Sequence, residues 1–121
     1  MRKIDITPFT IPVAVQLEDD KGQKSLQWQN VQYPFVDNVV NIVLSANNKL
    51  TARQLLERNM FCEKLVKAER EGQTDAMVEE TEYGPVQSTF EDFVGLGRND
   101  VEMVKRILEA PQVAVEKLPT A

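Results

Sequence analysis

Alternating apolar and polar residues mark the first third of the chain as β-structure. In the segment TIPVAVQLE, Val13, Val15 and Leu17 occupy every second position, which is the period of a strand with one buried face. The segment DDKG that follows has turn chemistry, with acids that bond nearby backbone amides and then a glycine. We therefore predict a β-hairpin over residues 10–32. Pro8 and Pro12 near its start suit an edge strand.

The second half of this hairpin contains a change of phase. In KSLQWQNVQY, Leu26 and Trp28 alternate with polar residues, and Val31 and Tyr33 then alternate in the opposite phase. A phase change at Asn30 indicates a bulge, a bend or the end of the strand. An aromatic cluster at strand ends is usually core, but Trp28 and Tyr33 are also candidates for partner contact.

Helical periodicity begins after the hairpin. An apolar stripe at i, i+3, i+4, i+7 and i+8 runs from Val36 to Leu44 and favours a helix, although its β-branched residues also suit a strand. In the next segment, Thr51 and Gln54 fit a helix capping box. One side of that helix is predicted to be buried and carries Leu55, Phe61, Cys62, Leu65 and Val66. Leu56 and Met60 fall on the opposite side and contact either another part of the fold or a partner.

The remaining segments are predicted to be a loop, two helices and a tail. Polar residues 71–80 indicate a loop, and a third helix starts near TEYGP with Pro85 in its first turn. Its buried stripe is predicted to be Val86, Phe90, Phe93 and Val94. Residues 112–121 include Val113 and Val115, which could add a short strand before the chain frays.

The segment VGLGRNDVEMVKRILEAP has two closely spaced glycines before an amphipathic run. It lacks the third glycine and the preceding strand of a dinucleotide-binding loop, because Asp100 occupies the third position. A corner between two helices explains the pattern, with Gly95 in a left-handed conformation and Asn99 as the N-cap of a helix with Val101, Val104, Ile107 and Leu108. A DNA-reading helix-turn-helix is disfavoured, since acids near the second helix's start would face phosphates.

The amino-acid composition argues against several classes of partner and of catalytic site. The 121 residues carry a net charge of −5, which argues against nucleic acid as the main partner, and no run of 18 apolar residues could span a bilayer. With no histidine and one cysteine, Ser-His-Asp triads, Cys-His pairs and zinc sites are not expected, and Cys62 is predicted to be a buried apolar residue. Adjacent acids such as Glu79-Glu80 are typical of solvated turns and helix faces. We therefore predict no catalytic residue, no cofactor and no metal.

The segments KLTARQLLERNMFCEKLVKA and FVGLGRNDVEMVKRILEAPQV resemble small proteins encoded by tailed bacteriophages. The resemblance covers residues 49–113 and rests on helix caps and stripes, so it assigns no functional residues. It implies a virus-encoded protein that works in a bacterial cytosol by binding, either in particle assembly or against a host machine.

Together these patterns predict a single α+β domain over residues 1–121. It consists of an N-terminal β-hairpin (10–32), a part with three to four helices packed against it (35–110) and a tail (112–121). The expected function is that of a non-enzymatic protein-binding or assembly protein, acting through a protein partner or by forming a homo-oligomer. Its candidate contact residues are Leu56, Met60, Trp28 and Tyr33. The alternative is an acidic regulator or inhibitor of a host enzyme that binds nucleic acid.

Overall fold

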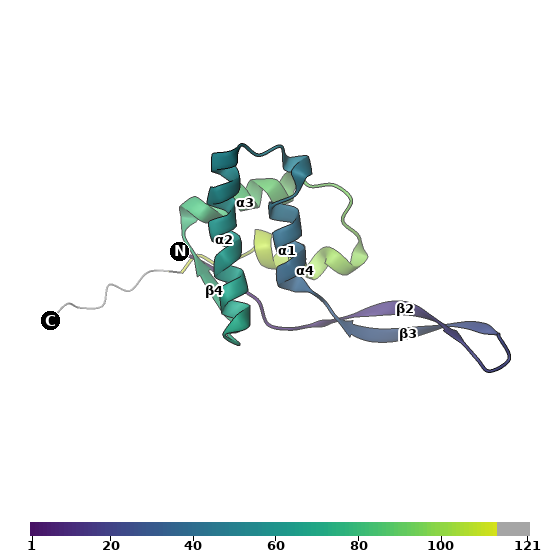
Figure 1. Cartoon of the computed structure of the whole chain (residues 1–121). Helices are drawn as coiled ribbons and strands as arrows, with labels where there is room; N and C mark the ends of the chain where they lie inside the picture. Colours follow the sequence, from purple (N-terminus) through teal and green to yellow (C-terminus); the bar gives the residue numbers. More distant parts are fainter. Residues whose placement is uncertain (114–121) are drawn as a thin grey trace.

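A computed structural model describes residues 1–113 and contains a helical body with one projecting hairpin (Figure 1). In chain order the elements are β1 (Arg2–Asp5), β2 (Thr10–Glu18), β3 (Lys24–Gln32), α1 (Phe35–Val43), the 3₁₀ turn η1 (Ala46–Asn48), α2 (Ala52–Arg70), β4 (Asp75–Val78), α3 (Glu80–Asp92), the 3₁₀ turn η2 (Arg98–Asp100) and α4 (Val101–Leu108). The α+β class predicted from the sequence is therefore confirmed.

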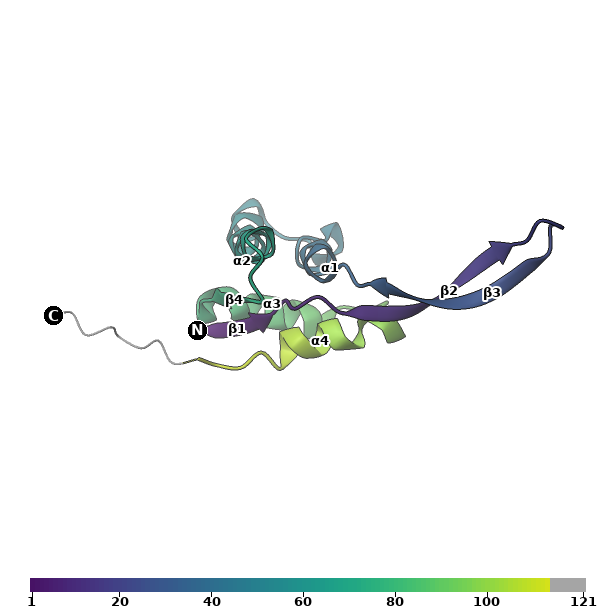
Figure 2. The same cartoon turned by 90° about the horizontal axis from the view of Figure 1, so that it is seen from below.

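The body is built around a short sheet at the centre of the helices. β1 pairs antiparallel with β4, with Lys3 opposite Met77 and Ile4 opposite Ala76. In Figure 2, α1 and α2 are seen end-on on one side of β1 and α4 lies on the other. Fully buried side chains from each of these elements form one core, which includes Ile4, Val36, Val39, Val43, Phe61, Leu65, Val78, Tyr83, Val86, Met103 and Ile107.

β4 corrects the prediction that residues 71–80 are a loop. The strand has only four residues, and Ala76 and Val78 are its buried positions. Such a short alternation carries little signal in a sequence, and the strand forms because β1, more than 70 residues earlier, supplies its hydrogen-bonding partners.

The chain returns to β1 a second time after α4. Gln112 forms an antiparallel bridge with Arg2, the amide of Lys3 donates to the carbonyl of Pro111 at 3.0 Å, and the amide of Val113 donates to the carbonyl of Met1 at 2.7 Å. Gln112 thus forms a single isolated bridge with β1, and no strand is present at residues 112 and 113. The predicted contribution of Val115 and the predicted fraying fall in 114–121, outside the described residues.

Two of the predicted helices form where the sequence places them, and the second also has its predicted cap. The stripe from Val36 to Leu44 corresponds to α1. At the start of α2, the amide of Gln54 donates to Thr51 Oγ1 at 3.2 Å and the amide of Thr51 donates to Gln54 Oε1 at 3.0 Å, which is the reciprocal capping box. Both signals depend on neighbouring residues, so they can be recognised from the sequence alone. The buried side of α2 includes Phe61, Cys62 and Leu65. Leu55, predicted on the same side, is 43% exposed, because no other described element covers the first turn of the helix at that position.

The third helix differs from its prediction at both ends. α3 starts at Glu80, because the amide of Glu79 donates to Glu82 Oε1 at 2.9 Å and caps the helix there. Pro85 therefore lies inside the helix, past its first turn. Val86 and Phe90 are buried as predicted, but α3 ends at Asp92, so Val94 leaves the helical stripe and is exposed.

The segment after α3 is a helix–loop–helix corner, as predicted, with a different cap. Gly95 has φ +96°, the left-handed conformation expected of it. Asn99 is not the N-cap, since it lies within η2, and α4 starts at Val101 after Asp100. The buried stripe of α4 is Met103 and Ile107, whereas Val101 is exposed.

The hairpin has the predicted bounds, because β2 and β3 pair from Thr10 opposite Gln32 to Glu18 opposite Lys24. The register is unbroken at Asn30, so the phase change there is not a bulge; Leu26 and Trp28 lie on one face and Val31 on the other. The prediction that the helices pack against the hairpin is wrong: they contact only its base, through Phe9 and Ile11, and most of it extends away from the body (Figures 1 and 2). The helices instead bury their apolar sides against one another and against β1 and β4. We call β2, β3 and their turn (10–32) the arm.

Candidate functional site

The arm exposes large apolar side chains along its length. Every residue of β3 is exposed, and Leu26 and Trp28 keep 74% and 73% of their surface accessible. Trp28 lies opposite Ala14 and Leu26 opposite Gln16, so both large side chains lie on the same face of the arm. Apolar side chains of this size are rarely left together in water unless they form a contact site.

The opposite face of the arm is also apolar. It carries Ile11, Val13, Val15 and Leu17 from β2 and Val31 from β3. Ile11 reaches the core of the body, whereas Leu17 and Val31 are exposed. A two-stranded ribbon has no second layer to cover either face, so both remain available to a partner.

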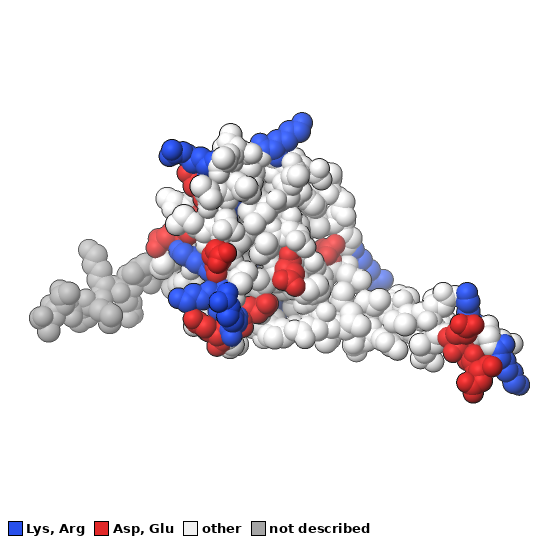
Figure 3. Space-filling model, in the orientation of Figure 1, with Lys and Arg blue, Asp and Glu red and all other residues white. Residues whose placement is uncertain are grey.

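Charge is confined to the tip of the arm. Residues 10–17 and 25–32 contain no Asp, Glu, Lys or Arg, whereas 18–24 contain three acids and two lysines. In Figure 3 the uncharged length of the arm separates the charged tip from the body. The tip is a well-formed turn: Asp19 Oδ1 accepts from the amides of Lys21 and Gln23 at 2.8 Å each, and Gly22 has φ +76°.

A hollow of about 620 Å³ lies where the arm meets the body. Pro12, Ala14 and Trp28 line it from the arm, and residues 97–100 line it from the body. Asp100 holds this loop in place, because its Oδ2 accepts from the amide of Gly97 at 2.8 Å and its Oδ1 accepts from the hydroxyl of Tyr33 at 2.6 Å. The loop that lines the hollow from the body is therefore hydrogen-bonded to Tyr33, the residue that follows the arm.

Tyr33 itself is not a surface contact residue. It is 4% exposed, its ring stacks on Phe9 with centroids 5.0 Å apart, and its hydroxyl also approaches Met103 Sδ at 3.3 Å. Burial, with the hydrogen bond to Asp100, raises the pKa of Tyr33 to about 12. The sequence made Tyr33, like Trp28, a candidate for partner contact. In the structure β3 ends at Gln32, and Tyr33, the next residue, is buried in the core.

An arginine that the sequence patterns did not indicate holds the segment before β2 in position. Arg106, on α4, donates to the carbonyl of Thr7 at 2.7 Å and to Glu102 Oε1 at 3.0 Å. Its guanidinium carbon lies 4.5 Å from the ring centroid of Phe9 and 5.6 Å from that of Phe35. These contacts attach the segment before β2 to the helical body.

The second candidate surface lies on α2. Leu56 and Met60 are 69% and 59% exposed, so the alternative that this side packs within the fold does not occur in the described structure. A shallow pocket of about 420 Å³ borders Met60 and is completed by α3 through Glu82 and Pro85. Lys64 Nζ of α2 lies 2.5 Å from Glu82 Oε1 of α3, so an ion pair joins the two helices beside this pocket.

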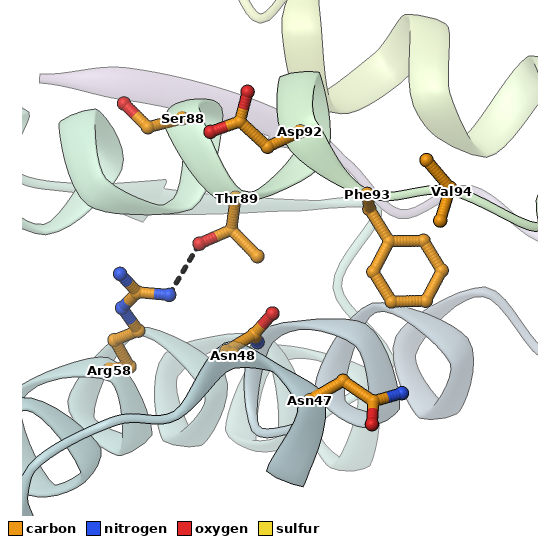
Figure 4. Close-up of a pocket in the computed structure, with 8 residues that line it drawn as sticks. All are labelled: Asn47, Asn48, Arg58, Ser88, Thr89, Asp92, Phe93 and Val94. Carbon is orange, nitrogen blue, oxygen red and sulfur yellow. Dashed lines mark hydrogen bonds between the residues drawn. The ribbon is translucent and has the colours of Figure 1, made fainter.

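A further pocket, of about 400 Å³, is lined by η1, α2, α3 and the residues that follow α3 (Figure 4). Arg58 donates to Thr89 Oγ1, which in turn donates to the carbonyl of Pro85 at 2.9 Å. Ser88 and Asp92 of α3 also line this pocket. Among the described residues Arg58 forms no ion pair with Asp92, and the Arg58–Thr89 bond joins the two helices.

Cys62 is a buried free cysteine on α2. Burial, followed by the charge of Glu63, raises the pKa of the Cys62 thiol to about 12, so it remains protonated and is buried as predicted. Within residues 1–113, no three Cys, Asp or Glu side chains gather closely enough to hold a metal ion. Nor does any helix of this part of the chain have the length and apolar character needed to cross a membrane.

Comparisons with known proteins find no relative of this chain. No family model, no curated protein and no solved structure matches the chain. The arm and the exposed side of α2 are therefore the features of the molecule that indicate its function.

Proposed function

We propose that this chain is a non-enzymatic binding protein that acts through protein–protein contact, with the arm as its main contact surface. The observation that supports this proposal is an uncharged two-stranded ribbon that exposes Leu26 and Trp28 outside the core. A folded domain gains nothing in its own stability from these side chains, because they bury little surface in it. They are typical of the aromatic and aliphatic anchors of protein interfaces.

The resemblance of residues 49–113 to phage-encoded proteins extends this proposal. A chain of that origin acts in a bacterial cytosol, on virion components or on a host protein. The exposed side of α2, with Leu56 and Met60, is the second contact surface that we propose.

The alternative, an acidic regulator of a nucleic-acid-binding enzyme, requires a continuous negative surface. The face in Figure 3 carries Lys and Arg among its Asp and Glu residues, which does not favour this alternative. An acidic regulator would bind its target by charge, and salt would weaken that complex steeply. Contact through the uncharged arm is expected to resist salt.

The test is affinity capture of the tagged protein from its host at low and at moderate salt. Leu26→Ser combined with Trp28→Ser is expected to remove the captured proteins at both salt concentrations. A Leu56→Glu and Met60→Glu double variant tests the α2 surface in the same way. Both variants should remain folded by circular dichroism, since all four side chains are exposed. If the Leu26/Trp28 variant captures the same proteins as the unmodified protein, the arm is not the contact surface.

A further inference from the structure

The two outer edges of the arm differ in their ability to pair with another strand. The amide of Tyr33 donates to the carbonyl of Phe9 at 2.9 Å, and the amide of Asp19 donates to the carbonyl of Gln23 at 2.9 Å. Hydrogen-bonded and non-hydrogen-bonded pairs alternate in an antiparallel ladder. In this register the odd-numbered residues bond across the arm, and the even-numbered residues direct their amides and carbonyls outward.

Pro12 interrupts the outer edge of β2. It is opposite Asn30, in a pair that is not hydrogen-bonded, so its missing N–H would have faced outward. The edge of β3 has no such interruption. Lys24, Leu26, Trp28, Asn30 and Gln32 present five outward amides and five outward carbonyls, without proline or glycine. An exposed edge of nine residues is a template for another strand.

The sequence of β3 suits pairing with a second copy of itself. Trp28 is the central residue of the strand, with four residues on each side. A two-fold axis at Trp28 pairs all nine residues, because Leu26 then faces Asn30 of the other copy and Lys24 faces Gln32. Lys24 is the only charged residue of the strand and lies at its end, so no like charges meet.

This pairing also covers the exposed apolar side chains. Residues opposite or diagonal to one another in neighbouring strands lie within contact distance on one face. The two Trp28 rings therefore meet at the axis, and each is diagonal to Leu26 of the other copy. The strands run in opposite directions, so the two helical bodies lie at opposite ends of the new sheet.

We infer that two copies of this chain associate by antiparallel pairing of their β3 edges, centred on Trp28, to form a four-stranded sheet. The inference rests on the proposed function and specifies one partner for it. It gives each arm the third and fourth strands that a ribbon needs for independent stability in water. Ten main-chain hydrogen bonds and the Trp28–Leu26 cluster hold the two copies together.

The test uses two proline substitutions on opposite edges of the same arm. Asn30→Pro removes an outward amide from β3, and by symmetry each dimer loses two hydrogen bonds and gains two steric blocks. Gln16→Pro is the matched control, since Gln16 has the same outward position on β2. Pro12 shows that this arm accepts proline at such a position.

Masses in solution are measured by sedimentation over a range of concentrations. The unmodified chain and Gln16→Pro are expected to form dimers, and Asn30→Pro to bind itself about ten-fold or more weakly. Leu26→Ser with Trp28→Ser, which leaves the backbone intact, is expected to weaken the dimer similarly. The emission of Trp28, the only tryptophan, should shift to shorter wavelength as the dimer forms.

An unmodified chain that stays monomeric would overturn this inference, as would a dimer that both proline variants retain. Neither result would decide the proposed function, because capture of a different protein through Leu26 and Trp28 is measured separately. Capture of the same proteins by the Leu26/Trp28 variant, with a dimer that Asn30→Pro weakens and Gln16→Pro retains, would count against a role for the arm in binding other proteins and would leave the pairing of β3 supported.

Discussion

At the scale of single residues, Asp100 and Tyr33 form the junction between the arm and the body. The Tyr33 hydroxyl donates to Asp100 Oδ1 at 2.6 Å, directly after β3 ends, and Asp100 also holds the loop at Gly97. A hydrogen bond from a hydroxyl to a carboxylate is stronger than an ordinary hydrogen bond between two neutral groups. This pair therefore fixes where the arm leaves the core.

Removing that hydroxyl should lower stability and change its dependence on pH. Tyr33→Phe is expected to reduce the free energy of unfolding at neutral pH by about 1 to 3 kcal/mol. The phenol loses its proton near pH 10 in the unfolded chain and near pH 12 in the folded one, because burial and Asp100 favour the neutral form. The stabilisation is thus fully present below pH 10 and is lost as the pH rises toward 12.

The measurement is urea unfolding of both proteins at several values of pH from 8 to 12. Cys62 and Tyr83 also have raised pKa values, so both proteins should lose stability in alkali. The difference between them should shrink between pH 10 and 12. A difference that stays constant over this range would show that the Tyr33 proton is not linked to folding.

At the scale of elements, α2 has two sides with opposite roles. Phe61, Cys62 and Leu65 are buried against the rest of the body, whereas Leu56 and Met60 face water. Only the first side contributes burial energy to the fold. The sequence shows both sides as apolar, and burial distinguishes them.

A pair of alanine substitutions on this helix separates the two sides. Leu65→Ala should cost about 2 to 5 kcal/mol in the free energy of unfolding, because it leaves a cavity in the core. Leu56→Ala should change it by less than about 0.5 kcal/mol, since that side chain is exposed. Urea unfolding of the two variants measures both values. A large loss for Leu56→Ala would mean that this side is covered in solution.

At the scale of the whole molecule, the body and the arm are structurally separable. The buried core lies in the helices and in the sheet of β1 and β4, and the arm touches it only at its base. Arg106 and Tyr33 hold that base from two sides. The body should therefore fold without the outer part of the arm.

Excision of the outer arm tests this separation. Residues 14–28 are replaced by an Asn-Gly turn, which joins Val13 to Gln29 across a hydrogen-bonded pair and suits a two-residue hairpin loop. The shortened protein should unfold cooperatively at a Tm within a few degrees of the full chain and should lose self-association. Calorimetry and sedimentation measure the two properties. Loss of cooperative unfolding would show that the body depends on the arm.

The sequence by itself determined the features that depend on near neighbours. The hairpin bounds, the turn at Asp19–Gly22, the α2 capping box and the left-handed Gly95 all follow from residues within a few positions of one another. Local hydrogen bonds and backbone preferences act over that range, so the features that they produce can be predicted from a single sequence.

Tertiary structure decided the features that depend on distant partners. β4 exists because β1 pairs with it, and Tyr33 is buried because Phe9 and Asp100 enclose it. The exposure of Trp28 was likewise decided by the fold, since an apolar residue in a strand looks the same in sequence whether or not a second layer covers it. Burial is a property of what the rest of the chain packs against, and here the helices pack on β1 and β4 and leave the arm uncovered.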